Sequence, residues 1–301
     1  MSFGFDLDPL IQSIQRIGLI NPPVLIEKKE GGLMIITGYK RILAHQEMAL
    51  DKIGCRIMAS DDLTPLECLH INLYDNLTVR KLNPVEKGMV LSRLHAWVAQ
   101  DEILFQYMPL LGLPSHKQTL VLYLKIEPNL DDAIKGALAG GRLSMQSLKT
   151  LMDLDPVSTT AVCSLITNIN FNINQQAQLV DDIIDISHIE RKSIPDILVE
   201  DPLKRMISDP HMNNPQKAKA ILNHLRCKRL PTVKKAEQIF KKKVSSLQIP
   251  KGVQITAPPN FEASRLTLTI SFNNGVQLKD KIRYLNELKG LDDLNFPWKM
   301  K

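Results

Sequence analysis

The chain has 301 residues, 44% of them hydrophobic and 23% charged, which is enough for two or three soluble domains with cores of their own. No apolar run approaches the roughly 18 residues that a membrane-spanning helix needs, and the first residues lack the basic start and apolar core of a signal peptide. The net charge of +6 is too small to indicate a partner by itself. We therefore expect a cytoplasmic protein with no membrane partner.

The cysteines are scattered along the chain, at Cys55, Cys68, Cys163 and Cys227, with no C-x-x-C spacing. Thiolate metal sites draw their ligands from closely spaced pairs. We therefore expect free thiols in a reducing compartment.

Residues 1–82 alternate between helical and strand patterns. Apolar residues recur at helical spacing from 6 to 18, and two β-rich runs, 24–26 and 33–37, flank a Gly-Gly turn. Helical patterns over 39–50 and 64–76 and a strand pattern over 53–59 complete the segment. This alternation predicts a small α+β domain.

Residues 83–245 are patterned as helices throughout. Asn83, Pro84 and Glu86 have the spacing of a capping box at a helix start. Glycine and proline breaks keep the helices short, and we place one domain at 83–156 and a second helical domain at 157–245. The second ends in a basic run, with eight Lys and Arg from Arg226 to Lys243, which is typical of a solvated helix face or of contact with a polyanion.

Residues 246–301 return to strand patterns. Runs over 252–256 and 265–272 are β-rich, 273–275 is typical of a turn, and 278–288 is patterned as a helix. A β-β-α tail of this size is too small to fold well alone. We expect it to pair with a second copy of the chain or to pack on the helical domain.

The segment Gly38-Tyr39-Lys40-Arg41 lies between a predicted strand and a predicted helix. Glycine lets the backbone approach a ligand closely, and the first N–H groups of a helix attract anions. Lys40 and Arg41 add cations where the helix dipole disfavours them, which indicates a phosphate site. A plain turn followed by a surface helix is the alternative interpretation.

A second polar cluster ends the helix predicted over 64–76. Asp75 could serve as a metal-side carboxylate, Asn76 as an orienting hydrogen-bond partner and Arg80 as a phosphate contact. Taken alone, the segment is more typical of a polar helix end that runs into a linker.

Residues 102–126 have the pattern of a helix-turn-helix. One apolar helix face leads to the turn Gly112-Leu113-Pro114, and Ser115 can cap a second helix with Leu120, Val121 and Leu124 as its apolar positions. Such a helix enters the major groove of DNA with its N-terminus first. The candidate DNA contacts are Ser115, His116, Lys117, Gln118 and Thr119.

The order of these segments resembles the ParB family of partition proteins. Residues 11–24, which end in SIQRIGLINPPV, are similar to the family's SI…GLI.P..V opening. The segment Gly38–Arg41 occupies the place of its G-E-R-R box. Asp75-Asn76 with 82–86 is similar to its E-N…LNP.E box, and Gly140–Ser144 is similar to its G.LS helix entry. The resemblance covers about residues 7–155.

The resemblance implies a ParB and sulfiredoxin-like α+β module, followed by an all-α helix-turn-helix region. The strand and helix patterns add the small β-β-α tail to this fold. It implies a protein of plasmid or chromosome partition, or of transcription regulation, associated with the nucleoid or a plasmid. Its partners would be double-stranded DNA, a second copy and a partition ATPase. CTP with Mg²⁺ would gate a dimeric clamp and be hydrolysed slowly, with Gly38, Lys40, Arg41 and Asn76 at the triphosphate.

The chain departs from the family pattern at the nucleotide site. Tyr39 stands where the family has an acid, Asp75 replaces a glutamate, and Arg80 lies one position late. These departures favour binding over hydrolysis. Sulfiredoxin activity needs a cysteine in the 38–41 loop, which has none.

Two other functions stay open at this point. One is an enzyme, a metal-dependent nuclease or small-molecule kinase, in which Asp75 holds a metal and Glu47 or Glu67 supplies the missing carboxylate. The other is a protein-interaction unit for transposon or phage functions.

Overall fold

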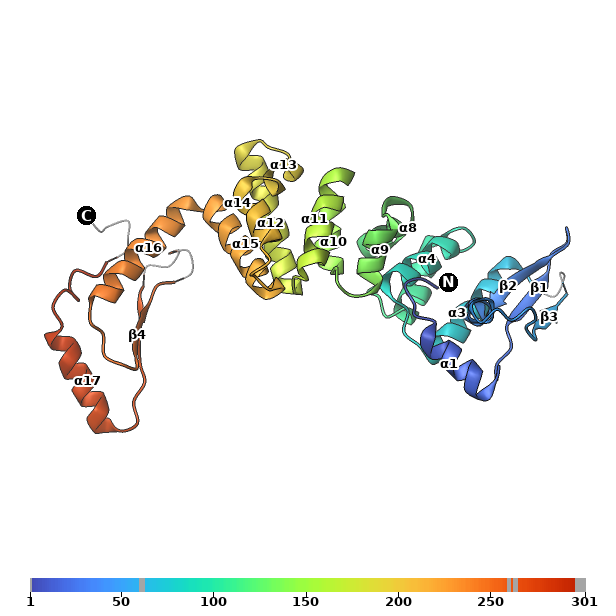
Figure 1. Ribbon diagram of the computed structural model, residues 1–301, viewed down its shortest axis with the longest axis horizontal. Coiled ribbons are helices and arrows are strands. Elements are labelled where there is room, and N and C mark those ends of the chain that lie inside the picture. The colour runs from blue at the N-terminus through green and yellow to red at the C-terminus, as the bar shows by residue number, and fades with distance from the viewer. Residues whose placement is uncertain (1, 60–62, 259–260, 262–264, 296–301) are drawn as a thin grey trace.

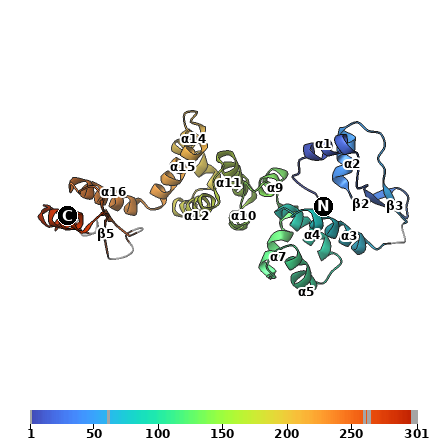
Figure 2. The same ribbon diagram turned by 90° about the horizontal axis from the view of Figure 1, so that it is seen from below.

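The computed structural model describes residues 2–59, 63–258, 261 and 265–295 of an elongated molecule. An α+β module lies at one end, an array of helices in the middle and a strand-containing tail at the other end (Figures 1 and 2). In both views the N-terminus lies beside α4 in the helical array, so the first residues run back from the module that they begin.

The N-terminal module is a three-stranded sheet with three helices. The strands β1 (Val24–Glu27), β2 (Leu33–Thr37) and β3 (Arg56–Met58) lie in the order β2-β1-β3. β1 pairs antiparallel with β2 and parallel with β3. The helices are α1 (Asp8–Ile17), α2 (Tyr39–Glu47) and α3 (Pro65–Val79). Every element predicted here is present; α1, α2 and β3 are shorter than predicted, whereas β1 and α3 are longer.

A small core holds α3 against the sheet. Ile26 and Ile36 come from neighbouring strands, and Cys68 comes from α3. Thr64 caps α3 through a capping box with Glu67, which fixes where the helix begins. β2 is an edge strand of this sheet, and three successive residues of it, 33–35, are exposed.

The helical array has one continuous core from Leu73 to Leu225. This core crosses the expected boundary at 156/157, where Asp155 caps α11 and Pro156 is its first residue. The helices of the array are α4 (Pro84–His95), α5 (Gln100–Glu102), η1 (Ile103–Tyr107), α6 (Met108–Leu110), α7 (Lys117–Leu124), α8 (Ile126–Asn129), α9 (Asp132–Ala139), α10 (Met145–Leu151), α11 (Pro156–Ile169), α12 (Ile173–Glu190), α13 (Ile194–Leu198), α14 (Asp201–Ser208) and α15 (Asn214–Arg229).

The first helix of the predicted helix-turn-helix is a run of α5, η1 and α6, in which η1 is a π-helical turn. The face predicted for its core is buried, including Ile103, Tyr107 and Met108. The second helix, α7, begins at Lys117 with His116 at its N-cap, so Ser115 is not the cap. Val121 is 47% exposed, and Tyr123 takes the buried position because it lies one turn beyond buried Leu120.

The tail packs on α16 (Pro231–Ser246) rather than standing alone. Strands β4 (Val253–Thr256) and β5 (Thr267–Ile270) pair antiparallel, and α17 (Gly275–Glu287) follows. Phe240 of α16 meets Phe261 edge to face, with ring centroids 5.7 Å apart, in a separate small core. The expected boundary at 245/246 therefore divides a packed unit. The predicted turn at 273–275 is wrong in part, because Asn274 caps α17 and Gly275 is its first residue.

All four cysteines are free thiols in the structure. Cys68 and Cys163 are buried, while Cys55 and Cys227 are half-buried, and burial raises the pKa of Cys163 to about 12. Among the described residues, no helix is both long and apolar enough to span a membrane.

Candidate functional site

Gly38 joins β2 to α2 and is held against the neighbouring strand connection. Its φ of 87° is left-handed, and a Cβ at this position would lie 2.7 Å from Cα of Pro23. Glycine is therefore required here both by backbone conformation and by close packing. The first N–H groups of a helix have no acceptor within it, so the loop presents donors suited to an anion.

Lys40 lies in the first turn of α2 beneath an aromatic ring. Its Nζ is 4.4 Å from the ring centroid of Phe5, a cation–π contact. Burial lowers the pKa of Lys40, the Arg80 guanidinium lowers it further, and the Glu86 carboxylate opposes the shift. These three charged groups thus share one electrostatic neighbourhood.

Tyr39 and Arg41 flank Lys40 in the chain. Tyr39 is 43% exposed and packs edge to face on Phe5, with ring centroids 6.5 Å apart. Arg41 is half-buried, and its backbone oxygen lies 3.0 Å from Nδ1 of His45.

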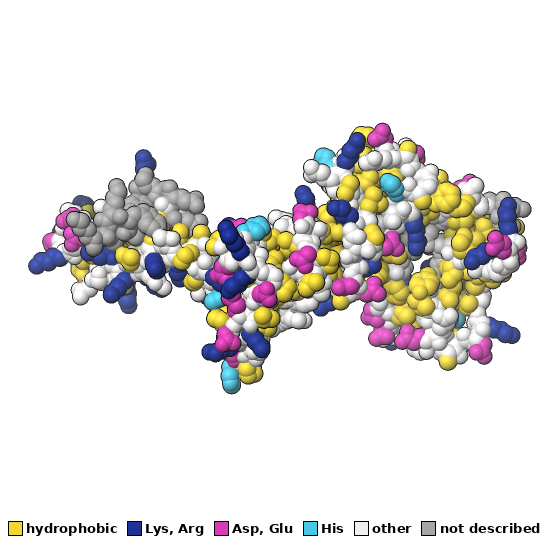
Figure 3. Space-filling model, turned by 90° about the horizontal axis from the view of Figure 1, so that it is seen from above, with side chains coloured by type: hydrophobic (Ala, Val, Ile, Leu, Met, Phe, Trp, Pro, Cys, Tyr) yellow, Lys and Arg dark blue, Asp and Glu magenta, His cyan; other side chains and the backbone are white. Residues whose placement is uncertain are grey.

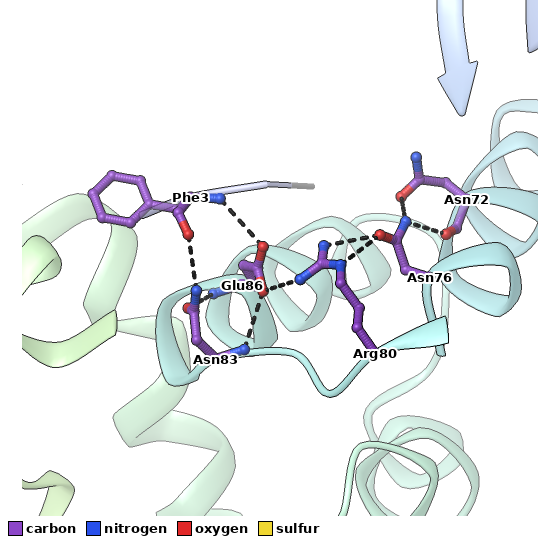
Figure 4. Close-up of polar contacts among 6 residues, drawn as sticks. All are labelled: Phe3, Asn72, Asn76, Arg80, Asn83 and Glu86. Carbon is purple, nitrogen blue, oxygen red and sulfur yellow. Dashed lines mark hydrogen bonds and ion pairs between the residues drawn. The ribbon is translucent and has the colours of Figure 1, made fainter. Parts of the chain in front are cut away.

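A row of polar side chains at intervals of four residues runs along α3 (Figure 4). Asn72 donates to the backbone oxygen of Ile36, two residues before Gly38. Asn76 donates to the backbone oxygen of Asn72 at 2.8 Å and accepts from Arg80 Nε at 3.0 Å. The row therefore carries Asn76 and Arg80 from the end of β2 toward the start of α4.

Glu86 is the hub of the network in Figure 4. It is 1% exposed and completes the predicted capping box of α4 with Asn83. Its Oε2 accepts from Arg80 Nη1 at 2.6 Å, and its Oε1 accepts from the backbone N–H of Phe3 at 3.3 Å. Asn83 Nδ2 donates to the Phe3 backbone oxygen at 2.8 Å.

The structure thus brings Lys40, Asn76 and Arg80 together but leaves Asp75 aside. Asp75 is exposed on α3 and lies off the row formed by Asn72, Asn76 and Arg80. Glu67 is engaged in its own capping box, and Glu47 ends α2, roughly 14 Å along the helix from Gly38. Within the described ranges, no three His, Cys, Asp or Glu side chains gather as a metal site would require.

A depression of about 430 Å³ adjoins the loop. Tyr39 and Asn72 line it together with Trp97 and Arg93 near the end of α4. Hydrophobic side chains gather around a hollow over this end of the molecule, at right in Figure 3. The surface next to the loop therefore combines aromatic and polar groups.

The predicted DNA-contact residues lie together at the start of α7. Ser115, His116, Lys117, Gln118 and Thr119 all line one depression of about 490 Å³, and His116, Lys117 and Gln118 are exposed. Lys149 of α10 lines the same depression. A helix N-terminus with exposed donors and a second cation beside it is suited to phosphates and base edges.

Sequence reasoning missed three participants. Glu86 was noticed only as a helix cap, because nothing in the sequence shows that its carboxylate also meets Arg80 and Phe3. The contacts of residues 3–5 are long-range and have no local pattern. Lys149 follows the Gly140–Ser144 helix entry by one turn, and that motif was the available signal.

The basic run from Arg226 to Lys243 is largely neutralised within the chain. Arg229 pairs with Asp182 at 2.8 Å and with Asp185, and Lys228 pairs with Glu190 at 3.0 Å and with Glu200. Arg226, Lys234 and Lys243 also have acidic partners. Ion pairs of this run therefore link α15 to α12, to the start of α14 and to α16. Fewer cations of the run are left for a polyanion.

Comparison with known proteins finds a family model that matches the N-terminal module. Residues 5–77 match the family model described as the ParB N-terminal domain. A probable chromosome-partitioning protein ParB of Vibrio cholerae is 26% identical over 174 residues, 58% of this chain and 57% of the relative. A probable chromosome-partitioning protein ParB of Pseudomonas putida is 30% identical over 155 residues, 50% of this chain and 51% of the relative. The chain thus spans just over half the length of these relatives.

Two solved structures of C-terminally truncated Caulobacter crescentus ParB also match. One, complexed to the centromeric parS site, is 19% identical and covers 60% of this chain and 91% of that one, with a TM-score of 0.33. The other, complexed with CTP-γ-S, is 20% identical and covers 55% of this chain and 88% of that one, with a TM-score of 0.23.

Proposed function

Since the chain carries a ParB N-terminal domain and is related to chromosome-partitioning ParB proteins over about half its length, we propose that it is a site-specific DNA-binding protein of a partition or regulatory system. The observation that carries the proposal is the depression at the start of α7, where five predicted contact residues meet Lys149. In this proposal α7 reads base edges in the major groove and Lys149 neutralises a nearby phosphate.

The loop at Gly38 is the proposed nucleotide site. Support comes from its left-handed glycine at a helix start and from the cations Lys40 and Arg80 beside Asn76. CTP with Mg²⁺ is the ligand that the family resemblance implies, with Tyr39 and Arg41 flanking the phosphates. In this proposal Asp75, which is exposed on α3 next to Asn76, is the carboxylate that would hold Mg²⁺. No observation favours the nuclease or kinase alternative.

The proposed partners are double-stranded DNA, a second copy of the chain and a partition ATPase. We also propose residues 1–82 as the nucleotide unit and 83–156 as the DNA unit, with 157–245 and 246–301 behind them. The packing of α16 on the tail favours a C-terminal unit that starts near Pro231.

Selection of binding sites from random double-stranded DNA tests the proposal. We expect one enriched sequence, for which Lys149→Ala lowers the affinity by about 5- to 20-fold through loss of a phosphate contact. Lys125→Ala is the matched control, because Lys125 is an exposed lysine at the opposite end of α7. An unenriched pool, or equal affinities of the two variants, would contradict the proposed interface.

A further inference from the structure

Residues 3–5 and Glu86 form a latch across the cationic site at Gly38. The Phe5 ring covers Lys40 Nζ. The backbone N–H of Phe3 donates to Glu86, and Glu86 pairs with Arg80 (Figure 4). Both cations beside the loop are thus engaged by one latch.

The latch also ties the N-terminal segment to the helical array. The Phe3 side chain packs against the core of the array, and a Cβ at Gly4 would lie 2.9 Å from Cβ of Ala139 in α9. Asn83 holds the Phe3 carbonyl at the start of α4. Residues 3–5 therefore contact the loop on one side and the array on the other.

The buried carboxylate of Glu86 pairs with Arg80, the cation that a bound phosphate would also need. It is 1% exposed, and its Oε2 lies 2.6 Å from Arg80 Nη1, so its charge is compensated chiefly by that guanidinium. A phosphate that recruits Arg80 would leave the carboxylate buried without its cation, which is strongly unfavourable. Recruitment of Arg80 by a phosphate and the present Arg80–Glu86 ion pair therefore exclude each other.

We propose that Glu86 and residues 3–5 act as an anion-competitive latch, which a polyphosphate at the Gly38 loop opens by taking Arg80 and Lys40. Opening frees the N-terminal segment from α4 and α9. The inference rests on the proposed nucleotide site and adds to it the group with which the ligand competes and the segment that it releases.

Glu86→Gln tests the competition. Glutamine keeps the capping box, which accepts Gln at this position, but removes the negative charge. We expect inorganic triphosphate and CTP, titrated by calorimetry, to bind Glu86→Gln ~5- to 30-fold more tightly than they bind the wild type. Glu67→Gln is the matched control, because Glu67 holds the same position in the capping box of α3 and is not paired with Arg80.

Phe5→Leu gives a second variant that leaves the capping box intact. Removing the ring over Lys40 should tighten triphosphate binding by about 2- to 5-fold, and Phe105→Leu, at a ring 71% exposed in η1, should leave it unchanged. In the wild type, saturating triphosphate should speed hydrogen exchange at residues 3–5.

The outcomes separate the latch from the site. If triphosphate binds the wild type, and binds Glu86→Gln equally or more weakly, the latch is overturned but the nucleotide site stands. The same holds if triphosphate binds the wild type and leaves hydrogen exchange at residues 3–5 unchanged. Binding to Glu86→Gln but not to the wild type would support the latch. Absence of binding to the wild type and both variants would overturn the nucleotide site itself, and the latch with it.

Discussion

At the scale of residues, glycine has two different uses in the N-terminal module. Gly31 and Gly38 share a φ of 87°, but a Cβ at Gly31 meets nothing within 4 Å, whereas one at Gly38 meets Pro23. Gly31 thus serves the hairpin turn alone, and Gly38 also sets how closely α2 approaches the strand connection. The comparison separates backbone strain from packing at the candidate phosphate loop.

Gly38→Ala should destabilise the module more than Gly31→Ala. Positive φ costs an alanine about 1–2 kcal/mol in either place, and forced contact with Pro23 adds roughly 1–3 kcal/mol at Gly38. Hydrogen exchange of the amides in β1 and β2 measures the difference as faster local opening. Equal exchange rates in the two variants would show that the loop relaxes away from Pro23.

The residue scale also shows where sequence reasoning ends. The candidate cations and Asn76 could be found because they are close to glycine or lie at a helix end. Their contacts with Phe5 and Glu86 could not be found, because the fold and not a local sequence pattern brings these residues together. Val121 was wrongly expected on the apolar face of α7. Successive residues of a helix point about 100° apart, so Val121 faces away from the core in which its neighbour Leu120 is buried.

At the scale of elements, caps and breaks predicted several helix starts, although Ser115 is not the cap of α7. Asn83, Ser144 and Asp155 all accept a backbone N–H in the structure as caps do. The same signals do not distinguish a break within a continuous core from a domain boundary, because Pro156 begins a helix in either case. The expected boundaries at 156/157 and 245/246 both fall within packed units for this reason.

The tail shows an apolar face without cover among the described residues. Leu268 on β5 is 49% exposed, and Phe272 just beyond the strand is 50% exposed. β5 pairs only with β4 in the two-stranded sheet, so its outer edge is available in the part of the chain that the structure describes. This arrangement is suited to the proposed second copy.

Leu268→Glu should therefore convert a dimer to a monomer. The charge would be buried without a partner in the proposed interface, at a cost of several kcal/mol. Thr269→Glu places the same charge on the opposite face of β5, where the residue is exposed, and should leave the dimer intact. Analytical ultracentrifugation gives the mass of each variant; two dimers, or a monomeric wild type, would contradict pairing through this face.

At the scale of the whole molecule, the candidate nucleotide site and DNA interface lie in adjacent parts of an elongated chain, with the tail at the far end (Figure 1). Composition predicted neither this spacing nor the internal pairing of the basic run, because both depend on how the helices stack. The net charge of +6 therefore does not show where on the surface the cations lie. The exposed donors at the start of α7 are the proposed DNA contacts.

The most direct test measures affinity for the selected DNA site by fluorescence anisotropy at several salt concentrations. For Lys117→Ala with Gln118→Ala we predict a loss of roughly 10- to 100-fold and a salt slope lower by about one. Gln46→Ala with Lys52→Ala, which removes the same exposed residue types from the N-terminal module, should bind as the wild type does. Wild-type affinity in the Lys117 and Gln118 double variant would contradict DNA recognition through α7.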